Sequence, residues 1–297
     1  MNSLKQIAVF LCIASMGIGA QEYEEKGEIV KEYPLVSIKG GAFRMGSPKT
    51  ERGRHRDEES RRVIVNDFLL SPHEVTQTEY ENVMGINPSH TKGKRLPVET
   101  VSWFNAIEFC NRLSEKEDLE PAYIIRGKRV LWDKGSEGYR LPTEAEWEFA
   151  CRADTTSAYN VGDVITTDQA NYYGRKTLPV ESFPANDFGI FDMHGNVWEW
   201  CWDGYGSYSR EVNNPAAEPD SVCVVRGGSF RSIAIDSRSA NRGSSTAVYR
   251  SWDTGFRVAR NFNDDSENTV GNFSDDSNNT AEDFGDEDIV EQQDPVD

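Results

Sequence analysis

Cysteine and histidine are the side chains of this sequence that could build a metal or nucleophilic centre, and their spacing supports neither. The sequence contains five cysteines and four histidines. No two cysteines form a Cys-x-x-Cys pair, and the histidines lie far apart in the chain, at His55, His73, His90 and His194. Zinc sites and Cys/His catalytic pairs usually show a close spacing of some of their members. We therefore expect neither in this protein.

The stretch from Val225 to Arg260 has instead the composition of a binding surface. It opens with Arg226-Gly-Gly-Ser-Phe230 and closes with Gly255-Phe-Arg-Val258, and the residues between follow neither a helical nor a strand period, which indicates loops on a scaffold. No Lys, Glu, Gln or Met occurs from Pro219 to Asn263. Ser, Gly, Asn, Arg, Tyr and Trp are the residue types of antibody-like paratopes. The alternative interpretation is that both glycine blocks are core turns and the interval is a solvated connection.

The charge of the chain excludes one class of partner. The 297 residues carry a formal net charge of -18. Thirteen acidic residues and no Lys or Arg lie between Asn261 and Asp297, which leaves 37 acidic and 32 basic residues in the rest of the chain. A negative protein repels phosphates, so we expect no nucleic-acid partner. The acidic tail has few large apolar residues and is predicted to be disordered.

The first twenty residues have the order of a secretory signal. A basic residue precedes an apolar run from Ile7 to Ile18, and small residues end the segment at Ala20. We expect cleavage near Ala20 and export to the periplasm, the cell surface or the medium. A lipid anchor on Cys12 is the one membrane attachment that the sequence offers, and the large residues Phe10 and Leu11 disfavour it. Four cysteines would remain, and the sequence does not assign their pairing.

The elements that must position the binding stretch are predicted from alternation and capping residues. Strands are expected at Pro34–Ile38 and Ala42–Met45, around a turn at Gly40-Gly41, and Val63–Leu70 again has strand character. The charged run from Thr50 to Arg62 is predicted to be a solvated loop.

Three helices are predicted from their N-terminal signals. Thr76 to Glu79 and Thr143 to Glu146 form capping boxes, and the first of these helices should run to about Met84. Ser102 is expected to cap the remaining helix, whose buried face consists of Trp103, Ala106, Ile107, Cys110 and Leu113. The chain is irregular from Arg152 to Asp187, where Asn171-Tyr-Tyr173 stands out. This pattern favours a single α+β domain whose loops are packed by their own aromatic residues.

Seven segments, taken in order, resemble the formylglycine-generating enzyme (sulfatase-modifying factor) domain family. They are Gly40–Gly46, Glu74–Thr76, Pro97–Trp103, Arg140–Trp147, Gly195–Trp200, Arg226–Phe230 and Gly255–Arg257. Several motifs in the right order are far more specific than any one of them. The resemblance implies an α+β, loop-rich fold of the C-type-lectin kind over residues 34–260. A signal peptide (1–20) and a linker (21–33) would precede it, and the acidic tail (261–297) would follow.

The enzymes of that family oxidise a substrate cysteine with two copper-binding cysteines that follow the Gly-Gly-Ser block. The resemblance places Ser232 and Ser237 at these positions. A hydroxyl is a hard, poorly ionised ligand that cannot replace a thiolate in copper binding or thiol exchange. No cysteine follows Cys223, so no shift of the alignment restores the pair. We expect no copper and no catalytic residues; the alternative is a divergent oxidase or sulfatase-modifying enzyme.

The resemblance also implies a structural calcium site. The side chains of Asn196 and Glu199 and the backbone carbonyls of Val197 and Cys201 match one of the family's sites, and an all-oxygen set suits a hard cation. The alternative is that Asn196 and Glu199 hold a turn by hydrogen bonds alone.

A subgroup with this fold consists of the variable proteins of diversity-generating retroelements, in which adenines of a template are rewritten between the Gly-Gly-Ser and Gly-Phe-Arg motifs. Rewriting the first two letters of an asparagine codon cannot yield Lys, Glu, Gln or Met, which would explain their absence; Trp252 departs from this pattern. The resemblance predicts an exported, monomeric, non-catalytic protein that binds a protein or cell-surface ligand. The alternative is a surface module with one fixed partner.

We call the predicted ligand-binding residues the recognition residues. They are Arg231, Ser232, Ile233, Ile235, Asp236, Gly243, Ser244, Ser245, Thr246, Val248, Tyr249, Ser251, Trp252 and Asp253. Tyr249 and Trp252 are the predicted hot spots, because buried aromatic anchors dominate interface energies. Structural roles, as donors to loop carbonyls, are predicted for Arg226, Ser229, Arg238, Arg242 and Arg257.

Overall fold

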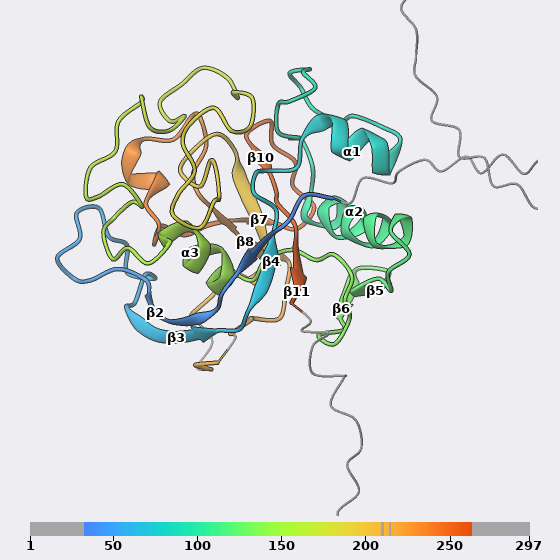
Figure 1. Cartoon of the computed structure of the whole chain (residues 1–297), viewed down its shortest axis with the longest axis horizontal. Coiled ribbons are helices and arrows are strands. Elements are labelled where there is room, and N and C mark those ends of the chain that lie inside the picture. The colour runs from blue at the N-terminus through green and yellow to red at the C-terminus, as the bar shows by residue number, and fades with distance from the viewer. Residues whose placement is uncertain (1–32, 209–210, 214, 263–297) are drawn as a thin grey trace, which may run out of the picture. The chain divides into compact units, whose positions relative to one another are not determined.

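The computed structural model describes residues 33–208, 211–213 and 215–262. The contacts within the chain mark off a unit that begins at Leu35, and the fold described here belongs to that unit. The predicted signal peptide, all but the last residue of the predicted linker and the tail from residue 263 onward lie outside the described residues. Short strands, three helices and long connecting loops make up the described part (Figure 1).

A four-stranded sheet holds both ends of the binding stretch. Its order is β10-β7-β8-β9. The strands are β7 (Trp198–Gly204), β8 (Val222–Arg226), β9 (Gly243–Thr246) and β10 (Thr254–Gly255). β8 is antiparallel to both β7 and β9, and β10 runs parallel to β7. The stretch leaves the sheet at the end of β8, returns in β9 and returns again in β10, so its loops start and finish on one rigid element.

The remaining strands form three smaller sheets. One has the order β1-β4-β11, and the other two are the pairs β2-β3 and β5-β6. Their bounds are β1 (Val36–Ile38), β2 (Gly41–Met45), β3 (Arg61–Val65), β4 (Phe68–Leu70), β5 (Tyr123–Arg126), β6 (Arg129–Trp132) and β11 (Ala259–Asn261). The strands expected at Pro34–Ile38 and Ala42–Met45 are confirmed, whereas the β5-β6 hairpin and β11 were not predicted.

The strand character predicted for Val63–Leu70 is confirmed, but the chain turns between β3 and β4, so the two strands belong to different sheets. Val65 pairs with Gly41, whereas Phe68 pairs with Ile38. The turn is fixed by Asp67, whose carboxylate accepts the backbone N–H of Gly40 at 2.9 Å. A side chain at Gly40 would meet the backbone of the facing turn at 2.3 Å. This close approach of two backbones was not visible in the hydrophobic pattern.

The three predicted helices are confirmed, and each begins with a complete capping box. They are α1 (Gln77–Met84), α2 (Trp103–Lys116) and α3 (Glu144–Arg152). In each box the hydroxyl of the capping residue accepts the N–H three residues on, while the side chain there accepts the N–H of the capping residue. Among the residues that the structure describes, none of these helices has the length and apolar character needed to cross a bilayer.

Helix α3 is buried almost all round, which sets an electrostatic requirement. It packs against β2 and β3 on one side and β7 and β8 on the other (Figure 1). Trp147, Phe149 and Ala150 belong to the hydrophobic core, but Glu144 and Glu148 are buried on the same helix. Carboxylates withdrawn from water must be paired with cations and hydrogen-bonded. The partners come from the binding stretch.

The charged run from Thr50 to Arg62 is a largely exposed loop as far as Ser60, as predicted, but two of its carboxylates are not solvated. Glu58 is fully buried and the side chain of Glu51 nearly so, and both pair with Arg238. The last two residues of the run begin β3. Charge alone could not reveal these partners, because Arg238 lies about 180 residues further along the chain.

Candidate functional site

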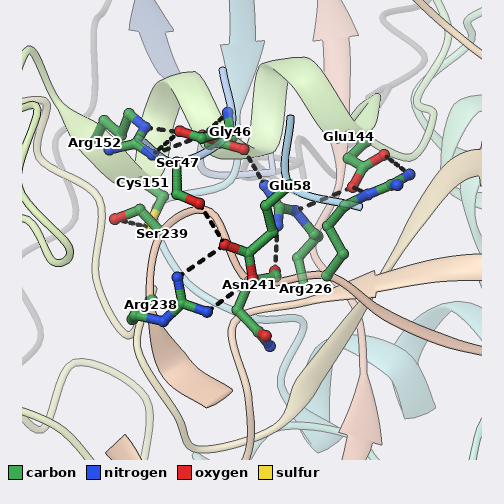
Figure 2. A network of polar contacts seen from close by, with 12 residues as sticks. Gly46, Ser47, Glu58, Glu144, Cys151, Arg152, Arg226, Arg238, Ser239 and Asn241 are labelled. Carbon is green, nitrogen blue, oxygen red and sulfur yellow. Dashed lines mark hydrogen bonds and ion pairs between the residues drawn. The ribbon is translucent and has the colours of Figure 1, made fainter. Parts of the chain in front are cut away.

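Arg226, at the end of β8, ties the start of the binding stretch to α3. Its guanidinium group is fully buried, pairs with the Glu148 carboxylate and donates to the backbone carbonyl of Asn241 (Figure 2). It also lies over the ring of Trp147, with its central carbon 5.2 Å from the ring centroid. The other Glu148 oxygen accepts the N–H of Gly46 at 2.8 Å. One carboxylate thus joins β2, α3 and β8.

Arg238 holds the middle of the binding stretch in place. It donates to both carboxylate oxygens of Glu58, at 2.7 and 2.9 Å (Figure 2). It also donates to the carbonyl oxygen of Gly53 at 2.8 Å. Its Nε donates to the carbonyl of Ile235 at 3.0 Å, which fixes the short helix η1 (Ala234–Ser237). The side chain therefore shapes the loop that carries Ile233 and Ile235.

Two further arginines complete the set of anchors. Arg242 forms a bidentate pair with Glu144 of α3, at 2.7 and 2.8 Å. Arg257 forms a bidentate pair with Glu199 of β7, at 2.6 and 2.7 Å. We call Arg226, Arg238, Arg242 and Arg257 the four arginine anchors. The structural role that the sequence predicted for them is confirmed by these contacts.

Ser229 belongs with the anchors, and its neighbours explain why glycine precedes it. Its hydroxyl accepts the N–H of Arg231 and donates to the Asp253 carboxylate, both at 3.2 Å. Gly227 and Gly228 adopt left-handed backbone conformations, with φ of 90° and 76°. A side chain on Gly228 would approach the Ser237 hydroxyl to 2.4 Å. The Gly-Gly-Ser block is therefore a tight turn that brings two parts of the stretch together.

The two positions that match the copper-binding cysteines are buried serines. The Ser232 hydroxyl accepts the N–H of Ser229 at 3.1 Å, and only 8% of Ser232 is exposed. The Ser237 hydroxyl is buried, and the described residues provide it with no hydrogen-bond partner. Neither oxygen fits copper(I), which requires soft thiolate ligands. The outward position predicted for Ser232 is wrong, because this hydrogen bond holds its side chain toward the interior.

The cysteines that remain are not arranged for thiol chemistry. In the described part of the chain Cys110, Cys151, Cys201 and Cys223 are all free and buried. Burial raises the pKa of the Cys151 thiol to about 12. His194 lies 3.9 Å from this sulfur, but burial lowers the pKa of the imidazole to about 4, and its Nδ1 contacts the Ser237 carbonyl at 2.7 Å. The Nε2 atom of His194 accepts the N–H of Asn160 at 3.1 Å, so neither ring nitrogen is left to take the proton of the thiol.

The residues predicted to hold calcium contact protein groups instead. Both oxygens of Glu199 bind the Arg257 guanidinium, and one also accepts the indole N–H of Trp147 at 2.8 Å. The side-chain oxygen of Asn196 accepts two N–H groups, from Asn171 and Leu178. Of the two backbone carbonyls in the predicted set, that of Cys201 accepts the indole N–H of Trp103 at 2.9 Å. Across residues 33–262 and outside their two short gaps, no group of three or more His, Cys, Asp or Glu side chains is placed for a metal. Calcium binding stays a prediction.

Apart from Ser232, the recognition residues are at least partly exposed. Val248, Tyr249, Ile233 and Trp252 rank among the exposed large hydrophobic residues of the described chain, with 67%, 54%, 51% and 41% of their surface accessible. Alternate residues of β9 are exposed, and β9 is an edge strand of its sheet. Side chains of this kind cost free energy to leave in water unless they contact something else.

Trp252 is the centre of one cluster of recognition residues. The guanidinium of Arg231 lies 4.8 Å from its ring centroid, and the ring of the buried Phe230 packs against it at 5.5 Å. Asp253, next in the chain, accepts from the Ser251 hydroxyl. A half-exposed indole held between a cation and a core ring is well placed for a ligand contact.

Two residues at this surface were not among those predicted. The ring of His90 lies 5.7 Å from that of Trp252. Tyr173 donates its backbone N–H to the carbonyl of Ser232 at 2.8 Å, has 77% of its surface exposed and holds a left-handed φ of 53°. Tyr173 carried a signal, since it lies in an aromatic segment of an irregular stretch. His90 carried none, because only the fold brings it to the binding stretch.

Comparison with known proteins places these features in a wider group. Residues 21–262 match the family described as "Sulfatase-modifying factor enzyme 1-like domain". The chaperone protein LppX of Paenibacillus barcinonensis is 32% identical over 86% of this chain and 99% of its own length. The formylglycine-generating enzyme of Mycobacterium tuberculosis is 38% identical over 66% of this chain and 86% of the enzyme. The serine/threonine-protein kinase pkn1 of Chlamydia caviae is 34% identical over 80% of this chain, which spans 40% of the kinase.

A solved structure has a similar fold. Treponema denticola variable protein 1 superimposes with a TM-score of 0.69 and 30% sequence identity, over 76% of this chain and 94% of that protein. The predicted fold class is confirmed: a loop-rich α+β fold of the formylglycine-generating-enzyme type, related to C-type lectins.

Two arginines of the binding stretch offer a matched test of which side chains hold the backbone. Replacing Arg238 by Met should lower the free energy of unfolding by about 3 kcal/mol or more, because Glu58 and Glu51 lose their buried cation. Replacing Arg231 by Met should change it by less than about 1 kcal/mol, because that side chain is 52% exposed. Denaturant unfolding of both variants measures the difference. Equal losses would contradict the division into anchors and surface.

Proposed function

This chain belongs to the sulfatase-modifying factor enzyme 1-like domain family, and on that premise we propose that it is an exported, monomeric, non-catalytic binding protein. Its ligand, a protein or a cell-surface group, is bound by the loops between β8 and β11. The observation that supports this proposal is that the binding stretch contains two sets of side chains, one buried and one exposed. Four arginine anchors are buried in ion pairs, whereas Ile233, Tyr249 and Trp252 present large apolar surfaces to solvent.

The exposed side chains of the stretch differ from the anchors in what they contribute to the stability of the fold. A loop whose conformation is fixed by buried ion pairs and backbone hydrogen bonds does not need its outward side chains for stability. Phe230 donates its N–H to Asn196, Ser239 to Ala158 and Ala259 to Arg140, each at 2.8 Å or less. Exposed residues between such points are free to be chosen for contact with a partner, as in antibody loops.

We further propose that this surface is diversified by a retroelement. The missing Lys, Glu, Gln and Met of the stretch support this, as does the 30% identity to a solved protein named as variable. None of the four arginine anchors is a recognition residue. Diversification requires a scaffold that tolerates every product, which the anchors supply.

A randomised library tests the recognition surface while the natural ligand is still unidentified. Ile233, Ser244, Thr246, Tyr249 and Trp252 would be randomised together, and the chain displayed and selected on lysozyme as the probe protein. Most members should resist protease as the parent does, and selected binders should lose binding when Trp252 or Tyr249 is changed to Ala. A control library at five buried positions should not fold. Loss of protease resistance in most members of the first library would overturn the proposal.

The rival activity is oxidation of a substrate cysteine, and a direct assay separates it from binding. The purified chain would be incubated with copper and a cysteine-containing peptide, alongside the related Mycobacterium tuberculosis enzyme as positive control. We expect formylglycine, detected by mass spectrometry, only in the control, because serine hydroxyls replace both thiolates. Product above the background of a copper-only sample would establish an enzyme.

The retroelement proposal is tested in DNA rather than in protein. The sequence downstream of the coding region should contain a near-copy of the codons for residues 226–257, differing only at adenines, and then a gene for a reverse transcriptase. If neither is present, diversification is rejected, while the binding surface could still serve a fixed partner.

A further inference from the structure

A cavity of about 670 Å³ opens beside the recognition surface. Three segments far apart in the sequence enclose it: residues 48–52, residues 156–165 and residues 233–238. Its size lies within the range of sites that hold small molecules. Ile233 and Ile235 contribute to its wall, so the cavity is continuous with the recognition residues.

The floor of the cavity is apolar and rigid. Ala158, Tyr159 and Ile165 belong to a small hydrophobic cluster of buried residues. The Tyr159 hydroxyl donates to the carbonyl of Ala234 at 2.8 Å, which joins the floor to helix η1. None of these residues lies in the part of the chain that we propose to vary. A fixed apolar floor favours a hydrocarbon group over a polar one.

The rim of the cavity comes partly from the recognition residues. Ile233 is about half exposed at the opening. Ile235 packs so closely against Gly53 that a side chain there would come within 2.5 Å of it. The rim therefore contains Ile233, which is free to contact a ligand, and Ile235, which packs against the loop at Gly53.

The charged groups that line the cavity differ in whether they already have partners. Glu51 and Arg238 pair with each other. Asp163 accepts the N–H of Ala158 at 3.3 Å with one of its oxygens. In the described part of the chain, Arg52 makes neither a hydrogen bond nor an ion pair, although it lines the cavity and is exposed. A guanidinium group with all its donors unused is a fork for a carboxylate.

We propose that this cavity binds an apolar group that carries a carboxylate, with the hydrocarbon part on the floor of Ala158, Tyr159 and Ile165 and the carboxylate on Arg52. The inference rests on the proposed function, since it names the chemistry that part of the recognition surface takes. Ile233 sets how much of the hydrocarbon is covered. Variation at residue 233 then changes the preferred ligand without changing the floor.

Fragment binding to the full chain tests the charge requirement. The probes are 3-phenylpropionate, its amide and phenethylamine, titrated while protein NMR shifts are recorded. The carboxylate should bind and shift resonances of residues 156–165, and the amide and the amine should bind about two- to fivefold more weakly, which is the range that an exposed ion pair can contribute. Equal binding of all three, or tighter binding of the amine through Asp163, overturns the proposal.

Variants locate the site and keep the test independent of folding. Arg52→Gln should weaken carboxylate binding to the level of the amide, and Ile233→Ala should weaken all three probes. Both residues are exposed, so melting temperatures should stay at that of the parent. Ile86→Ala is the matched control, since it truncates an exposed isoleucine that neither lines the cavity nor belongs to the recognition residues, and it should leave binding unchanged. An unchanged affinity in Arg52→Gln contradicts the assignment.

Two peptides distinguish the source of the carboxylate. Capped Ser-Phe-Glu-Ser and Ser-Phe-Gln-Ser differ only in the charge beside the aromatic group. Preference for the first supports a protein ligand that supplies the apolar group and carboxylate from neighbouring side chains. Binding of 3-phenylpropionate alone supports a small-molecule acid. If the randomised library folds and yields binders but no carboxylate probe binds, this inference fails and the proposed function stands.

Discussion

Buried pairing between arginine and carboxylate is the interaction on which the described fold depends. Helix α3 and strand β7 place Glu144, Glu148 and Glu199 where water cannot reach them. A buried carboxylate without a cation would cost several kcal/mol, so these side chains require the guanidinium groups of the binding stretch. The requirement is mutual, because irregular loops have few backbone partners of their own. Each ion pair fixes a point of the binding stretch to a helix, to a strand or, for Arg238, to the loop before β3.

This constraint separates two kinds of residue within a few positions of sequence. Arg238 is buried against Glu58, whereas Ile233 and Ile235 on the same loop face the cavity. Arg226 and Arg242 follow the same rule around β9. A scaffold of this kind does not depend on the side chain at residue 237 for its shape, because the Ser237 hydroxyl has no hydrogen-bond partner among the described residues and a serine is smaller than a cysteine. The chemistry and the architecture are therefore separable.

Much of the fold was readable from the sequence because its signals are local. Capping boxes and three-four spacing gave all three helices, and alternation gave the strands β1 and β2. Long-range contacts were not readable. The charged run around Glu58 resembled a solvated loop because its partner, Arg238, lies far along the chain. Ser232 was assigned to the surface because alternation cannot show a hydroxyl turned inward by Ser229, and His90 reaches Trp252 only through the fold.

Native-state hydrogen exchange tests most directly whether the anchors, rather than the outward side chains, hold the loops. The informative amides are those of Phe230, Ser239 and Ala259, which donate to backbone carbonyls outside the binding stretch. We expect these amides to exchange only by global unfolding, with the same denaturant dependence as the amide of Trp147 in α3. Exchange through local opening, at a free energy well below that of unfolding and insensitive to denaturant, would contradict it.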